Sequence, residues 1–302
     1  MALITTGPIY AITGANGHIG SALARALIAD GKRVRALGRD QKKLATLGAA
    51  ERVFGSLDDA MYLTKAFAGT AAVFLMIPPF YASGDYLGYG RRTTEAMMTA
   101  LAASPATHIV ALSSVGAELA AGSGLIRALH GLEERLQTLG RNLLVLRPVY
   151  FLENHLASIP VIKGMGAFGS ALNPDLAQGM IATADIAAYA AKRLSALDFN
   201  GTVVQSLQGA KDYTLRQVAA TLGKEIGKPD LPCVQFPYAD AQKAMIGMGF
   251  SPNVAELFME MVKGLNDGVI KPTVPRSAET TTPTTLGQFA KSFAAAFRAS
   301  GP

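Results

Sequence analysis

A glycine-rich segment between a predicted strand and a predicted helix constrains the fold of this chain more than any other feature. The apolar run Ile9–Thr13 is typical of a buried strand, and residues 18–30 carry apolar side chains at helical spacing. The intervening segment, Thr13–Gly20, has the sequence TGANGHIG. Glycine permits a tight turn and lets the backbone approach a pyrophosphate, whose charge is attracted by the free N–H groups at the start of the helix.

The strand before this segment and the helix after it distinguish a dinucleotide-binding loop from an ordinary glycine-rich turn, which is the alternative interpretation. Glycine spacing alone would be a weak signal, because many turns contain several glycines. The residues expected around the cofactor phosphates are Gly14, Asn16, Gly17, His18, Ile19 and Gly20.

The N-terminal half alternates between short apolar runs and helical patterns, which is typical of a parallel sheet covered on both faces. We therefore predict an α/β fold, a Rossmann-type doubly wound parallel sheet. Asp30 and Gly31 suit a helix C-terminus, Asp40 and Asp58 suit helix N-caps, and Pro148 is expected to break regular structure just after the sixth strand. The predicted strands are Ile9–Thr13, Arg33–Leu37, Arg52–Phe54, Ala72–Ile77, His108–Leu112 and Leu143–Leu146, and the predicted helices span 18–30, 40–47, 58–68, 85–103 and 122–139.

After residue 150 the alternation weakens. Residues 1–150 are expected to form an NAD(P)-binding Rossmann domain whose sheet is completed by about 180–208, and residues 151–302 mainly a smaller, mostly helical, substrate-binding lobe. Gly164–Gly169 and Lys271–Thr285 are expected to be irregular, and each is a candidate lid. Further predicted elements are a helix near 183–196, a strand at Thr202–Leu207, helices at about 214–227, 239–247 and 253–266, and a final amphipathic run Leu286–Phe297.

The end of the second predicted strand indicates which dinucleotide is bound. An acidic residue there binds the ribose 2′-hydroxyl of NAD, whereas an arginine accommodates the 2′-phosphate of NADP. This chain places Gly38 where the acid is expected, which leaves room for a phosphate, and Arg39 next to it. Lys42 and Lys43 add positive charge, while Asp40 suits a helix cap. We expect NADP(H) to be preferred over NAD(H), the alternative being that these charges are merely solvated.

Ligands of open parallel sheets lie beyond the carboxyl ends of the strands, so the residues directly after each strand are candidates for binding. Ser56 and Leu57 come after the third strand and are expected near the adenine. The prolines among the others could instead simply end strands. The nicotinamide pocket is expected to contain Met76, Ile77 and Pro78 after the fourth strand, Ser113 after the fifth, and Pro148, Tyr150 and Phe151 after the sixth.

The acid–base pair Tyr-x-x-x-Lys, in which lysine lowers the pKa of the tyrosine, does not occur at any of the nine tyrosines. His130 and Glu134 lie at spacing i, i+4 in the helix where that pair would fall, with Arg127 one turn earlier. His130 is therefore a candidate proton donor or relay, with Ser113 as a second catalytic candidate. The alternative is an exposed histidine that pairs with Glu134.

Composition excludes several other classes. Half of the 302 residues are apolar and 17% are charged, no run of 18 apolar residues occurs, and Arg25 is the first basic residue, so a cytoplasmic globular protein is expected rather than a membrane or exported one. The single cysteine, Cys233, has no metal-ligand spacing around it. The basic cluster between Lys32 and Lys43 contains no aromatic residue, which favours a small anionic ligand over nucleic acid.

Together these motifs resemble the NmrA-like family of atypical short-chain dehydrogenases, and most closely its quinone oxidoreductase and triphenylmethane reductase type. The resemblance covers most of the chain, including the terminal stretch Thr282–Leu286. The stretches that carry it are Thr13–Gly20, Arg39, His130 with Glu134, Leu146–Asn154 (LRPVYFLEN) and Ala182–Ala187.

The resemblance implies hydride transfer from NADPH to a conjugated small molecule, which needs little acid catalysis because the reduced anion is delocalised. A dry pocket is expected around Met76 and Phe151, with Phe80, Tyr81, Tyr150 and Asn154 near the substrate. The family also contains noncatalytic redox sensors that bind NADP, so a regulatory protein is the main alternative. A nucleotide-sugar epimerase is a lesser one, because the tyrosine–lysine pair is missing. A homodimer or a protein partner is also considered.

Overall fold

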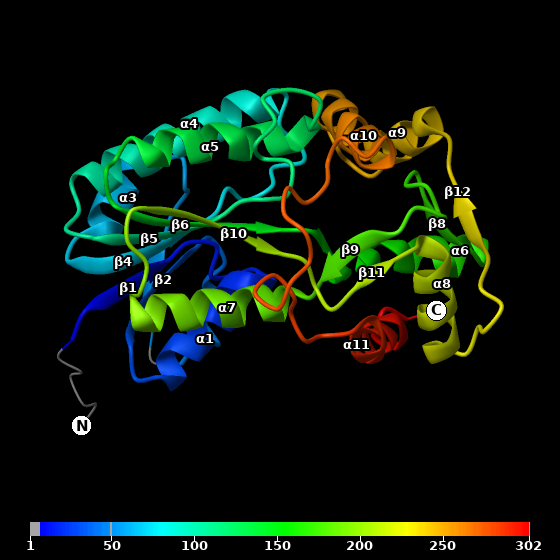
Figure 1. The fold of residues 1–302 in the computed structure, drawn as a ribbon, viewed down its shortest axis with the longest axis horizontal. Coiled ribbons are helices and arrows are strands. Elements are labelled where there is room, and N and C mark those ends of the chain that lie inside the picture. Colours follow the sequence, from blue (N-terminus) through cyan, green and yellow to red (C-terminus); the bar gives the residue numbers. More distant parts are fainter. Residues whose placement is uncertain (1–6, 49, 302) are drawn as a thin grey trace.

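The computed structural model describes residues 7–48 and 50–301. Its centre is a seven-stranded parallel sheet with the strand order β10-β6-β5-β4-β1-β2-β3 (Figure 1). The predicted strands all occur in it, and the predicted strand at 202–207 forms one edge, so the Rossmann-type fold is confirmed. The strands are β1 (Ile9–Ile12), β2 (Arg33–Gly38), β3 (Glu51–Phe54), β4 (Thr70–Leu75), β5 (His108–Leu112), β6 (Asn142–Pro148) and β10 (Thr202–Leu207).

Helices cover both faces of this sheet, with α3, α4 and α5 above it and α1 and α7 below it in Figure 1. In β1, Tyr10 and Ile12 belong to one buried cluster, whereas Ala11 belongs to the cluster on the opposite face. Because both faces are dry, these strands are continuously apolar rather than alternating. The helices of this part are α1 (His18–Ala29), α2 (Gln41–Ala45), α3 (Ala60–Phe67), α4 (Tyr86–Ala102), η1 (Gly124–Ile126), α5 (Arg127–Gln137) and α7 (Thr183–Ala196).

The strand order reverses at β1, which lies between β4 and β2. The chain leaves β1 toward β2 and β3 on one side, and the later strands extend the sheet on the other. All neighbouring pairs are parallel, so the carboxyl ends of the strands share one edge. Loops diverge at such a reversal, and this is where open α/β sheets bind ligands.

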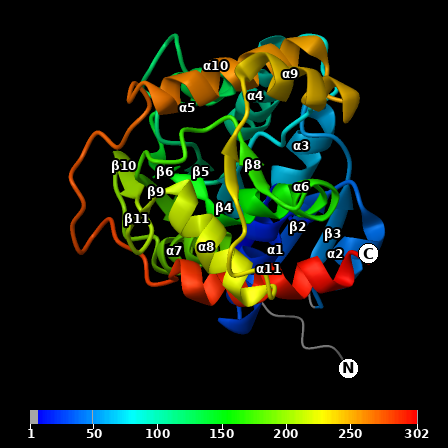
Figure 2. The same ribbon diagram turned by 90° about the vertical axis from the view of Figure 1, so that its right-hand side faces the viewer.

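The second half of the chain adds a lobe, whose elements face the viewer in Figure 2. This lobe has its own apolar core. It contains two small sheets, of strand orders β11-β9-β7 and β12-β8, and is less purely helical than expected. Its elements are β7 (Tyr150–Phe151), η2 (Leu152–Ser158), α6 (Ile159–Met165), β8 (Phe168–Ser170), β9 (Gln178–Ile181), β11 (Asp212–Tyr213), α8 (Leu215–Glu225), β12 (Cys233–Gln235), α9 (Tyr238–Gly247), α10 (Pro252–Asn266) and α11 (Leu286–Ala299).

Two local predictions are wrong. The N-cap of α3 is Asp59 rather than Asp58, because Asp59 accepts hydrogen bonds from the backbone N–H groups of Met61 and Tyr62. Either aspartate is a residue type that caps helices, and the hydrogen bonds show that Asp59 does so here. The stretch Gly164–Gly169 is not irregular, since it holds the end of α6 and the start of β8, with Gly166 as a left-handed helix cap at φ +67°.

The stretch Lys271–Thr285 lacks helix and strand, as expected, and connects α10 to α11. Several hydrogen bonds fasten it to the main sheet: the Gln208 backbone N–H donates to Thr280 O at 2.7 Å, and the Gln208 side chain to Val274 O at 2.9 Å. Asp185 at the start of α7 accepts from both the backbone N–H and the hydroxyl of Thr284. This segment is therefore held to the end of β10 and to the start of α7.

Within the described ranges, no helix is both long and apolar enough to cross a bilayer. The same residues contain no group of three or more histidine, cysteine, aspartate or glutamate side chains arranged to hold a metal ion.

A buried histidine in the second lobe generates a prediction about stability. The ring of His155 is 3% exposed and lies 5.4 Å from the Tyr150 ring and 5.6 Å from the Phe168 ring. This burial lowers the pKa of His155 from 6.5 to about 4. Between these values the unfolded chain binds a proton that the folded chain rejects, so His155 contributes stability above pH 6.5 that is lost as the pH falls toward 4.

We therefore expect His155→Phe, which keeps a ring in the same apolar site, to lose less stability on acidification. Urea unfolding of both proteins between pH 7 and pH 4 measures the difference, which should approach about 3 kcal/mol at the acid end. If the free energy of unfolding of both proteins changed equally with pH, this role of His155 would be contradicted, since all other titrating groups are common to the two proteins.

Candidate functional site

The turn after β1 has the conformation that only glycine adopts easily. Gly14 has φ +64°, and the next residue, Ala15, donates its N–H to Leu37 O of β2 at 3.0 Å. A Cβ atom at Gly14 would lie 2.7 Å from the sulfur of Met76, at the end of β4. The positive φ therefore favours glycine at this position, and a larger residue would also have to displace the flexible Met76 side chain.

The start of α1 is held against that turn by a second glycine. A Cβ atom at Gly20 would lie 2.3 Å from the carbonyl oxygen of Gly14, which is fixed backbone. The helix is preceded by Gly17 in extended conformation, has no side-chain cap and carries no acid in its first turn. Its first N–H groups and positive dipole end are thus available to an anion, as a pyrophosphate requires. Gly17 and His18 are both exposed there, while Ile19 is buried in the core.

The end of β2 differs in one respect from the prediction. Gly38 does not simply leave room for a phosphate, because the Asn16 side chain occupies that space: a Cβ at Gly38 would lie 1.5 Å from Asn16 Oδ1. Asn16 in turn donates to the carbonyl oxygen of Asp40 at 2.7 Å and so joins the two loops. Asp40 caps α2 as predicted, by accepting from the Lys43 backbone N–H at 3.1 Å.

Arg39 directly follows β2 and carries its charge at the surface. It is exposed, and within the part of the chain that the structure describes it makes no ion pair or side-chain hydrogen bond. Its charge acts on Tyr89 of α4, whose pKa is raised mainly by burial and lowered in part by Arg39. Nearby, Ser56 is exposed after β3, whereas Leu57 is buried in the core.

The loops after β1 and β4 are joined by one buried hydroxyl. Thr13 donates its hydroxyl to Phe74 O and accepts the Met76 N–H, both at 3.0 Å. Ile77 is then buried, and the carbonyl oxygen of Pro78 accepts from the Tyr89 hydroxyl at 3.1 Å. The predicted residues Gly14 and Met76 therefore meet at the reversal of strand order.

Aromatic side chains continue the loop after β4. Phe80 is 47% and Tyr81 43% exposed, and their rings are oriented by partners. Phe80 contacts the Tyr89 ring edge-to-face at 5.5 Å, and Tyr81 stacks on Phe250 at 4.5 Å. Phe250, which precedes α10, is not among the predicted site residues. It lies far from Tyr81 in the sequence, and no local pattern indicates that the two rings meet.

Side chains after β5 and β6 form a buried polar network. Glu133 of α5 is 2% exposed, accepts from the Ser113 hydroxyl and pairs with Arg147 of β6. Arg147 also donates to Glu118 at 3.0 Å. The sequence prediction included Ser113 but not Glu133. Glu133 lies on the same face of α5 as the apolar residues Leu132 and Leu136, and an acidic residue on an apolar face indicates a buried, paired carboxylate.

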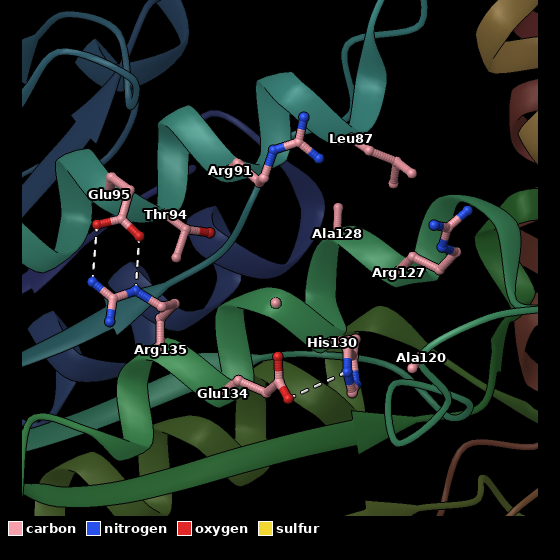
Figure 3. Close-up of a pocket in the computed structure, with 11 residues that line it drawn as sticks. Leu87, Arg91, Thr94, Glu95, Ala120, Arg127, Ala128, His130, Glu134 and Arg135 are labelled. Atoms are coloured by element: carbon pink, nitrogen blue, oxygen red, sulfur yellow. Dashed lines mark hydrogen bonds and ion pairs between the residues drawn. The ribbon is translucent and has the colours of Figure 1, made fainter.

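The second catalytic candidate, His130, forms the pair that its spacing predicts. Its Nε2 lies 3.5 Å from Glu134 Oε1, and its Nδ1 lies 2.8 Å from the carbonyl oxygen of Ala117. His130 also lines a cavity of about 390 Å³ between α4 and α5, together with Arg91 and Arg127 (Figure 3). No hydrogen bond between described residues joins His130 to Ser113, so a catalytic role for either stays a prediction.

The residues after β6 lead into the second lobe. Pro148 still belongs to β6, where it pairs with Leu207, and Tyr150 and Phe151 form β7 against β9. Burial raises the pKa of Tyr150 to about 12, with a smaller lowering from a hydrogen bond to Asn154. The Tyr150 phenol is therefore protonated at neutral pH and can donate a hydrogen bond.

Comparisons with known proteins agree with this geometry. The sequence pattern of a family described as NAD(P)H-binding matches residues 14–196. NAD(P)H azoreductase from Xenophilus azovorans is 27% identical over 300 residues, which cover 95% of this chain and 99% of the azoreductase.

Solved structures give the same picture. NADPH-dependent quinone oxidoreductase from Escherichia coli, crystallised with NADPH, superposes with a TM-score of 0.77 at 25% identity and covers 94% of this chain and 99% of its own. Triphenylmethane reductase from Citrobacter sp. gives a TM-score of 0.78 over 96% and 100% of the two chains, and at 18% identity this likeness shows the fold alone. The resemblance predicted from the sequence is confirmed.

The contact between Gly20 and Gly14 can be tested directly. Gly20→Ala should lower stability by about 1–3 kcal/mol and weaken dinucleotide binding, because the new methyl group pushes α1 away from the turn. Gly287→Ala is the matched control, since Gly287 lies in the first turn of α11 with no atom near its added Cβ. Thermal unfolding and fluorescence titration with NADPH measure both effects, and equal behaviour of the two variants would refute the packing argument.

Proposed function

Because the chain belongs to the NAD(P)H-binding family, we propose that it is an NADPH-dependent oxidoreductase that transfers a hydride to a quinone-like or other conjugated small molecule. Two relatives support this assignment by their names: one is an NAD(P)H azoreductase and the other an NADPH-dependent quinone oxidoreductase. Both match nearly the full length of this chain.

The observation that carries the proposal is the loop after β2, beside the glycine turn. Arg39 is exposed and unpaired among the described residues, and Lys42 and Lys43 next to it form no ion pair with them either. A 2′-phosphate would give this cluster the anionic partner that the protein does not supply. The one carboxylate of this loop, Asp40, caps α2 through its Oδ1 atom rather than standing where the ribose 2′-hydroxyl is usually bound, directly after β2.

The residues that would hold the cofactor fit it. The turn at Gly14 and the uncapped start of α1 would bind the pyrophosphate, Arg39 the 2′-phosphate, and Met76, Ile77, Pro78 and the residues after β5 and β6 would border the nicotinamide. When bound, NADPH supplies the hydride. The chain itself contributes orientation and the exclusion of water.

The acceptor would lie against the aromatic residues of the loop after β4. Phe80 and Tyr81 present partly exposed rings whose orientation is fixed by Tyr89 and Phe250. We assign Tyr150 and Asn154, which follow β6, to the same acceptor site. A planar conjugated molecule gains stacking energy on such rings. Its reduced form delocalises charge, so the protein need not supply a strong acid, and the Tyr150 phenol can donate a hydrogen bond.

The proposed setting is the cytoplasm. Cys233 is the single cysteine of the sequence and is half-buried, so the fold does not depend on an oxidising compartment. A small-molecule acceptor also requires no nucleic acid or membrane surface.

Turnover is the first test. We expect the purified protein to oxidise NADPH in the presence of quinones and azo dyes, measured by the loss of NADPH absorbance, with NADH as the poorer donor. Tight NADPH binding without oxidation across a diverse acceptor panel would overturn the reductase and favour a noncatalytic sensor.

The preference for NADPH has its own test. Arg39→Ala should weaken NADPH binding by about 1.5–3 kcal/mol and NADH binding much less, because the lost interaction is a charged hydrogen bond to the 2′-phosphate. Arg298→Ala, which removes an exposed arginine from α11, is the control for net charge. Fluorescence titration with both nucleotides measures the change, and an equal loss for NADPH and NADH would remove Arg39 from the 2′-phosphate site.

A further inference from the structure

The buried network behind the end of β5 joins Ser113, which the proposed function places beside the nicotinamide, to charged residues that have no role in that function so far. Both carboxylate oxygens of Glu133 accept from Arg147, with Nε 3.0 Å from Oε1 and Nη2 2.5 Å from Oε2. The remaining nitrogen of the guanidinium, Nη1, donates to Glu118. Oε1 of Glu133 also accepts the hydroxyl of Ser113, so one oxygen is shared by a serine and an arginine.

This geometry determines where the hydroxyl proton of Ser113 lies. A two-pronged contact with a guanidinium is the arrangement of an ionised carboxylate. The hydrogen bonds that Arg147 donates to Glu133 also raise the pKa of Arg147, which keeps the guanidinium charged. An ionised carboxylate can only accept hydrogen bonds. Ser113 must therefore donate its single proton to Glu133.

We propose that Glu133 is a positioning residue that fixes Ser113 as a hydrogen-bond acceptor toward bound ligand. Ser113 directly follows β5 at the carboxyl edge of the sheet, and no donor among the described side chains reaches its oxygen. Ser113 is 3% exposed, and no backbone N–H of the described residues donates to its oxygen either, so its lone pairs lack a partner that an N–H or O–H group of a ligand at this edge would supply. The proposed site offers two such groups: the carboxamide N–H of the nicotinamide and a hydroxyl of the acceptor. The inference rests on the proposed function and deepens it.

One chemical consequence distinguishes this arrangement from a serine that polarises a carbonyl. A carbonyl oxygen needs a donor, and Ser113 has no proton to give while Glu133 is ionised and paired with Arg147. Ser113 then favours ligands that donate a hydrogen bond to its oxygen, and it does not protonate the reduced acceptor.

The cofactor arm of the test compares NADPH with its 3-acetylpyridine analogue, which lacks the amide N–H. If the donor is the nicotinamide, Ser113→Ala should weaken NADPH binding about three- to tenfold and leave the analogue unchanged, whereas Ser113→Thr, which keeps the hydroxyl, should restore binding. The acceptor arm measures kcat and KM for quinones with and without a ring hydroxyl. If the donor is the acceptor, only the hydroxylated quinones should lose kcat/KM by that factor.

Glu133→Gln tests the positioning role. It should reproduce the selectivity change of Ser113→Ala, and the double variant should show no further loss, because both substitutions break one interaction. Should Glu133→Gln fail to fold, Arg147→Lys, which removes the two-pronged contact, takes its place. Ser104→Ala and Glu95→Gln are matched controls: Ser104 is a buried serine beside Arg141, and Glu95 forms a two-pronged pair with Arg135.

Three outcomes overturn the inference. In the first, Ser113→Ala changes neither the preference for NADPH over its acetylpyridine analogue nor the preference for hydroxylated quinones. In the second, Glu133→Gln lowers the melting temperature without changing these preferences, and in the third, both variants lose affinity equally for ligands with and without donors. The proposed function can fail separately. If the wild-type protein binds NADPH but oxidises none, the reductase is refuted, while the cofactor arm still decides the role of Ser113. If it binds no NADPH, both are refuted.

Discussion

The contact between Gly20 and the carbonyl oxygen of Gly14 is the constraint on which the candidate site depends. It places the first turn of α1 directly against the turn after β1, so the free N–H groups of the helix point to the edge where the strand order reverses. Thr13 joins this turn to the loop after β4, and Asn16 joins it to the loop after β2. Three loops are thereby fixed before any ligand arrives, which reduces the ordering cost of binding.

The second half of the site is organised differently, by charge rather than by backbone packing. Glu133 and Arg147 lose most of their hydration in the fold, and a buried ion pair seldom repays that loss in stability, since apolar residues of similar volume often do as well. The ion pair therefore contributes mainly by fixing the relative positions of the elements that it joins. The pair anchors α5 to β6 and, through Ser113, to the end of β5. A rigid guanidinium fork suits this purpose better than a flexible ammonium group.

The sequence predicts the sheet well because the relevant signals are local. A strand buried on both faces needs a continuous apolar run, and Gly14 and Gly20 are the residues that a close backbone contact demands. Choices between neighbours are harder: Asp58 and Asp59 can each cap a helix, and the sequence alone contains no signal that selects Asp59. Contacts between distant residues, such as Tyr81 with Phe250, leave no pattern in either segment. The sequence predicts room for a phosphate at Gly38, whereas the Asn16 side chain lies in that space, and only the folded chain shows this contact.

The hydrogen-bonding state of the candidate acid–base groups bears on the chemistry that the site can support. His130 has one ring nitrogen at the Ala117 carbonyl and the other near Glu134, and Ser113 has its proton committed to Glu133. Tyr150 retains its proton to a pKa of about 12, so it can donate a hydrogen bond but is a weak acid. A reaction that must protonate a localised alkoxide would be poorly served by these groups. A hydride transfer whose product spreads its negative charge over a conjugated system makes the smallest demand on them, and is therefore the oxidoreductase chemistry that this arrangement suits best.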